Sequence, residues 1–156
     1  MRRRREVLGL PVIDLANGRR VGDLEELYID LQSQAVVGFL VTQGRWLVRR
    51  YLLKADDVVA VGPDAATIED REVLVPFSRV ARTPFTYEKQ LVGKRVLSPH
   101  GEDLGTIADV FLDDHELKVT AYEISGGLLA DLLDGKTVLA AVPVVIGKDA
   151  VVITDQ

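Results

Sequence analysis

The sequence predicts an all-β fold made of two small, strongly bent β-barrels, with a short helix in the second. A repeated phrase, a period-two alternation of apolar residues and closely spaced turn signals lead to this prediction. The phrase GRRVGDLEELYID at 18–30 returns as GEDLGTIADVFLD at 101–113, so that Gly18 and Gly101 lie 83 positions apart. Such internal repetition indicates two diverged copies of one structural unit.

The register of the repeat sets the domain boundaries. The 83-residue offset holds as far as Gly44 and Gly127, and VGPDAATI at 61–68 matches IGKDAVVI at 146–153 two residues later in register. We expect a first repeat with a basic N-terminal tail over 1–68, and a second repeat over 91–156. The linker at 69–90 is too apolar for a flexible tether, so we expect it to pack, with a short strand at EVLVPF. Two such copies can be arranged about a pseudo-twofold axis.

Each copy reads as a series of strands. Val37, Phe39 and Val41 alternate with period two, which is typical of a strand with one buried face. The long strand contains an irregular step, because Leu24 and Leu27 are three residues apart. The second copy repeats this step, and a β-bulge would return both leucines to one face while bending the strand. A bent strand in a short, turn-rich unit favours a small closed barrel.

Turn residues and one difference between the two copies complete the predicted fold. Asn17-Gly18 is typical of a tight hairpin turn, and we expect Asp30 and Asp113 to support turns by hydrogen bonds to the backbone. The segment GGLLADLLDGK at 126–136 predicts the short helix of the second copy. The corresponding segment of the first copy, GRWLVRRYLLK at 44–54, reads as a strand with basic residues between apolar ones.

Composition excludes several classes of site. The chain has no cysteine, which excludes disulfides, thiolate zinc sites and thiol nucleophiles. The net charge of -5 opposes nucleic acid overall, although a local basic patch can still bind it. MRRRREVLGLPV lacks the apolar run of a signal peptide, and no stretch approaches the ~20 apolar residues of a membrane span. We therefore expect a soluble, cytoplasmic protein.

No catalytic, cofactor-binding or metal site is predicted. The repeated glycines do not match a phosphate-binding loop and are interpreted as structural. The carboxylates Asp23, Glu25 and Glu26 could bind a metal, and the run DDHE at 113–116 is the better cluster because hard cations prefer grouped oxygens. No EF-hand pattern is present, however, and DDHE is interpreted as an exposed turn. His100 and His115 lie beside turn residues, and no serine lies in a nucleophile elbow, so both histidines are expected at the surface.

One cluster is the candidate interaction surface: Arg45, Trp46, Arg49, Arg50 and Tyr51. Arginine and tryptophan are enriched in protein hot spots, and arginine with aromatic residues can also hold nucleic acid. The alternative is a strand with a solvated basic face and Trp46, Val48, Tyr51 or Leu53 in the core. The tail at residues 2–5 could meet phosphates or anionic lipid, or be a frayed, solvated terminus.

The sequence segments of the two copies together resemble the PRC-barrel family, named for the photosynthetic reaction centre. The matching segments are LGLPVIDLANGRRVGDLEELYID, VVGFLV and LLKADDVVAVGPDAATI in the first copy, and LVGKRVLSPHGEDLGTIADVFLDD, TAYEISGGLLADLL and AVPVVIGKDAVVI in the second. The resemblance implies a small, strongly bent barrel. It implies no active site, because the family has no shared catalytic motif. Its members include the cytoplasmic part of the reaction-centre H subunit and a domain of a ribosome-maturation factor that binds a ribosomal protein.

We therefore expect a non-enzymatic adaptor or assembly module, without a cofactor, that binds a protein partner through a barrel surface. Two alternatives stay open: an RNA-processing or ribosome-maturation accessory protein, and a peripheral membrane module resembling the H-subunit domain. A homodimer is a further open alternative. A basic patch containing Arg45, Arg49 and Arg50 would favour RNA, and binding to anionic vesicles through residues 2–5 would favour the membrane.

Overall fold

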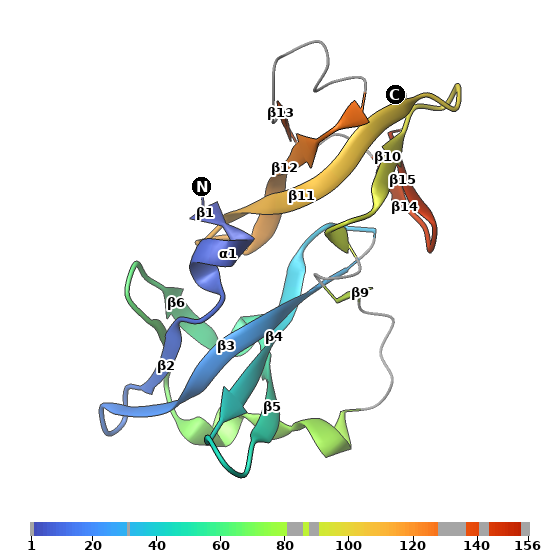
Figure 1. Cartoon of the computed structure of the whole chain (residues 1–156). Coiled ribbons are helices and arrows are strands. Elements are labelled where there is room, and N and C mark those ends of the chain that lie inside the picture. Colours follow the sequence, from blue (N-terminus) through green and yellow to red (C-terminus); the bar gives the residue numbers. More distant parts are fainter. Residues whose placement is uncertain are drawn as a thin grey trace.

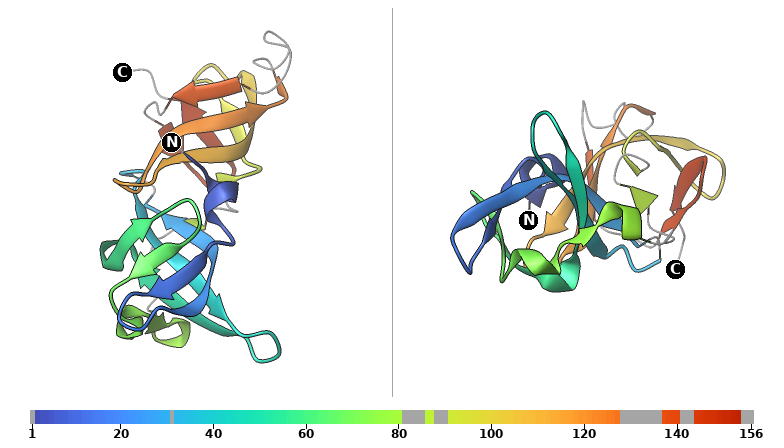
Figure 2. Two further views of the ribbon diagram at one scale, coloured as in Figure 1. Left: turned by 90° about the vertical axis from the view of Figure 1, so that its left-hand side faces the viewer. Right: turned by 90° about the horizontal axis from the view of Figure 1, so that it is seen from below.

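A computed structural model of the chain describes residues 2–30, 32–80, 86–87, 91–127, 137–140 and 144–153. Two curled sheets form two lobes that lie end to end, one for each copy of the repeat (Figures 1 and 2). The prediction of an all-β chain with two strongly bent sheets is confirmed.

The first lobe is a sheet with the strand order β6-β7-β2-β3-β4-β5-β8. Its strands are β2 (Pro11–Asp14), β3 (Arg19–Ile29), β4 (Val36–Gln43), β5 (Arg49–Lys54), β6 (Val58–Val61), β7 (Ala66–Ile68) and β8 (Val75–Pro76). Short 3-10 helices lie at η1 (Ala55–Asp57), η2 (Arg71–Val73) and η3 (Phe77–Arg79). The parallel pairing of β2 with β7 joins the start of the copy to its end.

The second lobe repeats this plan with the order β13-β12-β11-β10-β15-β14. Its strands are β10 (Arg95–Leu97), β11 (Asp103–Asp113), β12 (Lys118–Ser125), β13 (Thr137–Ala140), β14 (Val144–Ile146) and β15 (Ala150–Ile153). The parallel pair β10–β15 corresponds to β2–β7. The short helix expected over 126–136 falls mainly on residues 128–136, which lie outside the described residues.

The predicted bulges occur in both copies. The register of β3 against β4 shifts between Leu24 and Glu26, and the register of β11 against β12 shifts between Ile107 and Asp109. Leu24 and Leu27 are both buried as a result. The bulge therefore bends each long strand while it keeps the apolar positions on the core side.

Glycine is required where the long strands bend. Gly22 and Gly105 have φ values of 157° and 130°. A Cβ atom on Gly22 would lie 2.6 Å from the Thr42 carbonyl oxygen, and one on Gly105 would lie 2.6 Å from the carbonyl oxygen of Gly126. The neighbouring strand thus approaches too closely for a side chain, and the interpretation of these glycines as structural is confirmed.

The two copies meet through their equivalent hairpin turns. The Val36 amide donates to the Leu117 carbonyl over 2.7 Å, and the Val119 amide donates to the Gln34 carbonyl over 3.0 Å. Val36 corresponds to Val119 and Gln34 corresponds to Leu117 under the 83-residue offset, so each copy donates the same hydrogen bond to the other. Gln34 and Leu117 also share an unusual positive φ, of 58° and 53°. The contact is therefore reciprocal, as a pseudo-twofold axis requires.

The short segment that precedes each copy pairs with the long strand of the other copy. β1 (Arg2–Arg3) precedes the first copy but pairs with β11 of the second. β9 (Thr86–Tyr87) precedes the second copy but pairs with β3 of the first. The chain start therefore lies against the second lobe, followed by the short helix α1 (Arg4–Val7) (Figure 1). The expectation of a frayed N-terminal tail is wrong, because backbone pairing and α1 hold it in place.

The first part of the linker packs against the outer face of the first sheet, as predicted. Half-buried apolar residues of the linker cover Tyr28, Leu40 and Leu52. The rings of Tyr28 and Phe77 stack with centroids 6.5 Å apart. The short strand expected within EVLVPF is β8, which pairs with β5.

Candidate functional site

The arginines at the N-terminus are used inside the molecule. Arg3 Nε lies 3.0 Å from Glu123 Oε2, and Arg5 Nε lies 3.5 Å from Asp109 Oδ2. Asp109 and Glu123 are each 2% exposed, and the Arg3 guanidinium also lies 5.0 Å above the Phe111 ring. Buried carboxylates need such partners because desolvation of an uncompensated charge is costly. The tail therefore clamps the second copy.

Sequence reasoning missed both buried carboxylates. Asp109 and Glu123 are equivalent to Glu26 and Leu40 of the first copy. The replacement of an apolar residue by Glu123 on a core strand was a signal that a cation would be needed there. Its source, 120 residues away, could not be identified from spacing.

Two further carboxylates shape the turns at the pseudo-twofold axis. Asp30 accepts hydrogen bonds from the amides of Gln32 and Ser33 over 2.8 and 2.9 Å. Asp113 accepts from the amides of His115 and Glu116 over 2.8 and 2.9 Å. These donors lower the pKa of both carboxyl groups, with Ser33 the main cause at Asp30 and Glu116 the main cause at Asp113. The prediction that both aspartates support turns is confirmed.

A tyrosine also joins the copies at this axis. The Tyr122 hydroxyl donates to the side-chain oxygen of Gln34, which belongs to the other copy. Burial raises the pKa of the Tyr122 hydroxyl far above its ordinary value, and at neutral pH the hydroxyl is protonated, as an unshifted tyrosine also is. It serves as a donor in the contact between the turns.

The candidate interaction surface is divided by the structure. The strand expected over 44–54 is confirmed for residues 49–54, which form β5, and is wrong for residues 44–48, which form the tip of the β4–β5 hairpin. Trp46 is 101% exposed, Leu47 is 72% exposed and Val48 is 44% exposed, so the alternative is wrong for Trp46 and Val48. It is correct for Leu53, which is buried in the core, and Tyr51 is half-buried against that core. Arg45 lies at this tip, and Arg49 and Arg50 lie on the exposed start of β5.

Tyr51, the fifth residue of that cluster, belongs to the barrel. It is half-buried and packs against the main core. A cavity of about 470 Å³ next to it is lined by Arg49, Arg50, Pro76 and Phe77. The signal for the hairpin was Gly44, which has a φ of 96° and lies close to the Leu47 carbonyl oxygen, as a tight turn requires.

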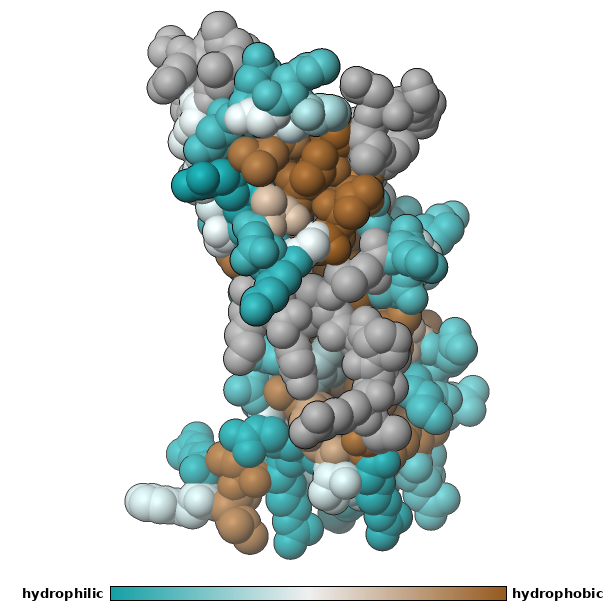
Figure 3. All heavy atoms as spheres, turned by 90° about the vertical axis from the view of Figure 1, so that its right-hand side faces the viewer, coloured by the Kyte–Doolittle hydropathy of each residue, from teal (hydrophilic) through white to brown (hydrophobic). Residues whose placement is uncertain are grey.

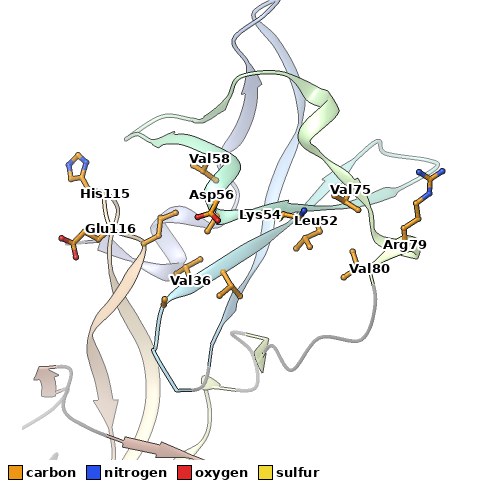
Figure 4. Close-up of a pocket in the computed structure, with 14 residues that line it drawn as sticks. Val36, Leu52, Lys54, Asp56, Val58, Val75, Arg79, Val80, His115 and Glu116 are labelled. Atoms are coloured by element: carbon orange, nitrogen blue, oxygen red, sulfur yellow. The ribbon is translucent and has the colours of Figure 1, made fainter.

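A larger cavity lies where the copies meet, and we name it the junction groove. Its volume is about 790 Å³. The residues that line it are Ala35, Val36, Val37, Leu52, Lys54, Ala55, Asp56, Val58, Val75, Arg79, Val80, His115, Glu116 and Leu117. The first copy and the linker supply most of this surface, and the 113–118 turn of the second copy supplies one wall (Figure 4).

Charge is distributed unevenly along the junction groove. Lys54 and Arg79 lie toward the end formed by β8 and η3, whereas Asp56 and Glu116 lie toward the turn of the second copy (Figure 4). Sequence reasoning missed this groove because it depends on how the copies are placed. Val37 and Val75 looked like ordinary strand residues, and His115 looked like part of an isolated turn.

The remaining candidates stay at the surface. His100 and His115 are exposed. Within the part of the chain that the structure describes, no three His, Asp or Glu side chains are grouped closely enough to hold a metal ion. In the same residues, no helix has the length and apolar character needed to cross a membrane.

Comparisons with known proteins agree with the fold. The family model described as PRC-barrel domain matches residues 1–83 and 85–155, one segment for each copy. The chain is also similar to the uncharacterized protein YrrD of Bacillus subtilis (strain 168). The two are 31% identical over 133 residues, which cover 84% of this chain and 74% of YrrD. Two curled sheets, each with a bulged long strand and each matched by the same model, place this chain in the PRC-barrel domain family.

Proposed function

We propose that this chain is a non-enzymatic adaptor or assembly module that binds a protein partner through the surface of its first barrel. The junction groove is the observation that carries the proposal. It combines an open aliphatic floor with charged side chains at its margin, the arrangement of an apolar interface core with a polar rim.

The floor of the junction groove suits a protein segment. Val37, Val75 and Val80 are half-buried and come from three different elements. Aliphatic surface of this kind gains free energy when a partner removes it from water. Because the turn of the second copy forms one wall, the groove exists only when both copies are in place.

The margin of the junction groove supplies specificity. Lys54, Asp56 and Arg79 have no ion-pair partner among the residues that the structure describes. Charges that are free and separated along a groove favour a segment that carries the opposite charges in the same order. An acidic residue of the partner would face Lys54 and Arg79, and a basic residue would face Asp56 and Glu116.

Affinity capture from the source cells tests this proposal. The full chain is the bait, and the extract is divided into nuclease-treated and untreated halves. We expect a defined protein to be captured in both halves, and to be lost from the double variant Lys54→Glu and Arg79→Glu. The double variant Arg19→Glu and Lys148→Glu is the matched control, because it reverses two exposed charges away from the junction groove.

Two results would contradict the proposal. Equal capture by both double variants would show that the junction groove is not the binding surface. Capture of RNA and ribosomal proteins that disappears after nuclease treatment would replace the protein adaptor with the ribosome-maturation alternative.

A further inference from the structure

The tip of the β4–β5 hairpin lies away from the junction groove and needs a separate explanation. The groove uses Val36 and Lys54, at the end of the hairpin where β4 starts and β5 stops. The tip uses residues 44–48, at the other end, and it projects from the lobe (Figures 1 and 2). A ligand on the tip and a partner in the groove can therefore be bound together.

Apolar side chains are concentrated at this tip. Trp46 and Leu47 are 101% and 72% exposed, so the rest of the protein covers none of the surface of Trp46 and only a minor part of that of Leu47. The space-filling view shows hydrophobic atoms on the projecting hairpin, beside atoms of intermediate hydropathy at its outer end, and hydrophilic atoms where it joins the lobe (Figure 3). Adjacent exposed apolar residues of this size usually mark an interaction site.

Positive charge lies directly behind the apolar apex. Arg45 precedes Trp46, and Arg49 and Arg50 follow on β5, all three exposed. None of these arginines has an ion-pair partner among the described residues. The segment 43–51 contains no acidic residue, although the whole chain has a net charge of -5. The tip thus carries a local positive charge behind an apolar end.

We propose that this tip docks the protein on an anionic lipid bilayer. Trp46 and Leu47 enter the interfacial layer, where tryptophan is favoured because its ring is apolar and its N–H is polar. Arg45, Arg49 and Arg50 then lie at the depth of the headgroup phosphates, with their apolar stems along the interface. The N-terminal arginines take no part, because Arg3 and Arg5 pair with buried carboxylates.

The order of residues favours a bilayer over a protein socket. A bilayer requires only apolar groups at the apex and cations behind them, and the hairpin presents its side chains in that order. With so few apolar side chains, binding should be reversible and should depend on anionic lipid. Removing two of the three arginines should weaken binding about 25-fold, since each basic residue near the surface contributes about fivefold.

The experiment uses the single tryptophan of the chain, Trp46, as its probe. The full chain is titrated with vesicles of phosphatidylcholine containing about 30% phosphatidylserine, and with vesicles of phosphatidylcholine alone. We expect a blue shift of the emission and quenching by brominated lipid with the anionic vesicles only. About 0.5 M NaCl should reverse both changes, because it screens the arginines.

Co-sedimentation with the anionic vesicles extends the test to variants that keep Trp46. The double variant Arg45→Gln and Arg49→Gln should bind about 25-fold more weakly. The control Arg19→Gln and Arg71→Gln removes two exposed charges elsewhere and should bind like the unchanged protein. The junction-groove variant Lys54→Glu and Arg79→Glu should retain the Trp46 blue shift and its quenching, which separates this inference from the proposed function.

Three outcomes would overturn the inference. The first is an emission of Trp46 that does not change with anionic vesicles. The second is a control variant that loses as much binding as the tip variant. The third is a blue shift that appears only with a captured protein, which would assign the tip to a protein socket.

Discussion

Replacement of Arg3 tests how the N-terminal strand joins the two copies. The Arg3 guanidinium lies 3.0 Å from the carboxylate of Glu123, which is 2% exposed. Arg3→Met keeps an apolar stem that can still cover Phe111 and removes the charge. Glu123 then stays buried on the outer face of the second sheet without this cation.

The size of the effect follows from burial. Breaking a buried ion pair by removing one partner costs about 3–5 kcal/mol. The Arg3 side chain is 36% exposed, so water already weakens the pair, and we expect Arg3→Met to lower the free energy of unfolding by about 2 kcal/mol. The residue equivalent to Glu123 in the first copy is Leu40, so Glu123→Leu is a substitution with a precedent in the same fold. The double variant should return to within about 1 kcal/mol of the unchanged protein.

Urea unfolding of the unchanged protein, the two single variants and the double variant forms a double-mutant cycle. Far-ultraviolet circular dichroism is the suitable signal, because Trp46 is exposed in the folded protein and its fluorescence would respond weakly. A loss below about 0.5 kcal/mol for Arg3→Met would refute the reasoning, since that is the range of ordinary surface substitutions. Single-variant effects that simply add in the double variant would also refute it.

Four other substitutions test the bend, the turns and the axis. Gly105→Ala should lower the free energy of unfolding by about 1–3 kcal/mol in urea titrations, because its Cβ would lie 2.6 Å from a carbonyl oxygen, whereas Gly18→Ala should cost less because its Cβ would meet nothing. Asp113 has a lowered pKa in the folded state, so its contribution is present above the ordinary value of 3.8 and is lost as the pH falls through the folded-state pKa. Asp113→Asn should therefore flatten the acid side of a plot of thermal stability against pH. Tyr122→Phe should cost about 1 kcal/mol in urea unfolding, because it removes the hydrogen bond to Gln34 across the axis.

Structural features that depend only on residues within one copy could be predicted from the sequence. The bulge near Leu24, the bend at Gly22 and the turn at Asp30 depend on residues close together in the chain. Each signal also occurs twice, at positions 83 apart, and the repetition separates a structural requirement from chance. The resulting outline of two bent barrels needed no knowledge of how the copies pack.

Features that depend on the placement of the copies could not be predicted in the same way. The partners of Arg3 and Arg5 lie in β11 and β12, so the arginines read as a solvated tail. The junction groove needs the turn of His115 to lie beside β4, which no local pattern encodes. The expectation of a strand at residues 44–48 is wrong for another reason: alternation of apolar and basic residues around a hairpin tip imitates the alternation of a strand.

The exchange of β1 and β9 between the copies has a consequence for synthesis of the chain. Arg2 pairs with Leu112, so the first strand to leave the ribosome finds its partner only after most of the chain has followed. β3, by contrast, receives β9 as soon as residues 86–87 emerge. The first barrel can therefore fold during translation, while the N-terminal arginines remain solvated until Asp109 and Glu123 have been synthesised. Long-range pairing of this kind slows folding. Formation of the β1–β11 pair by the N-terminus therefore indicates that both copies have folded.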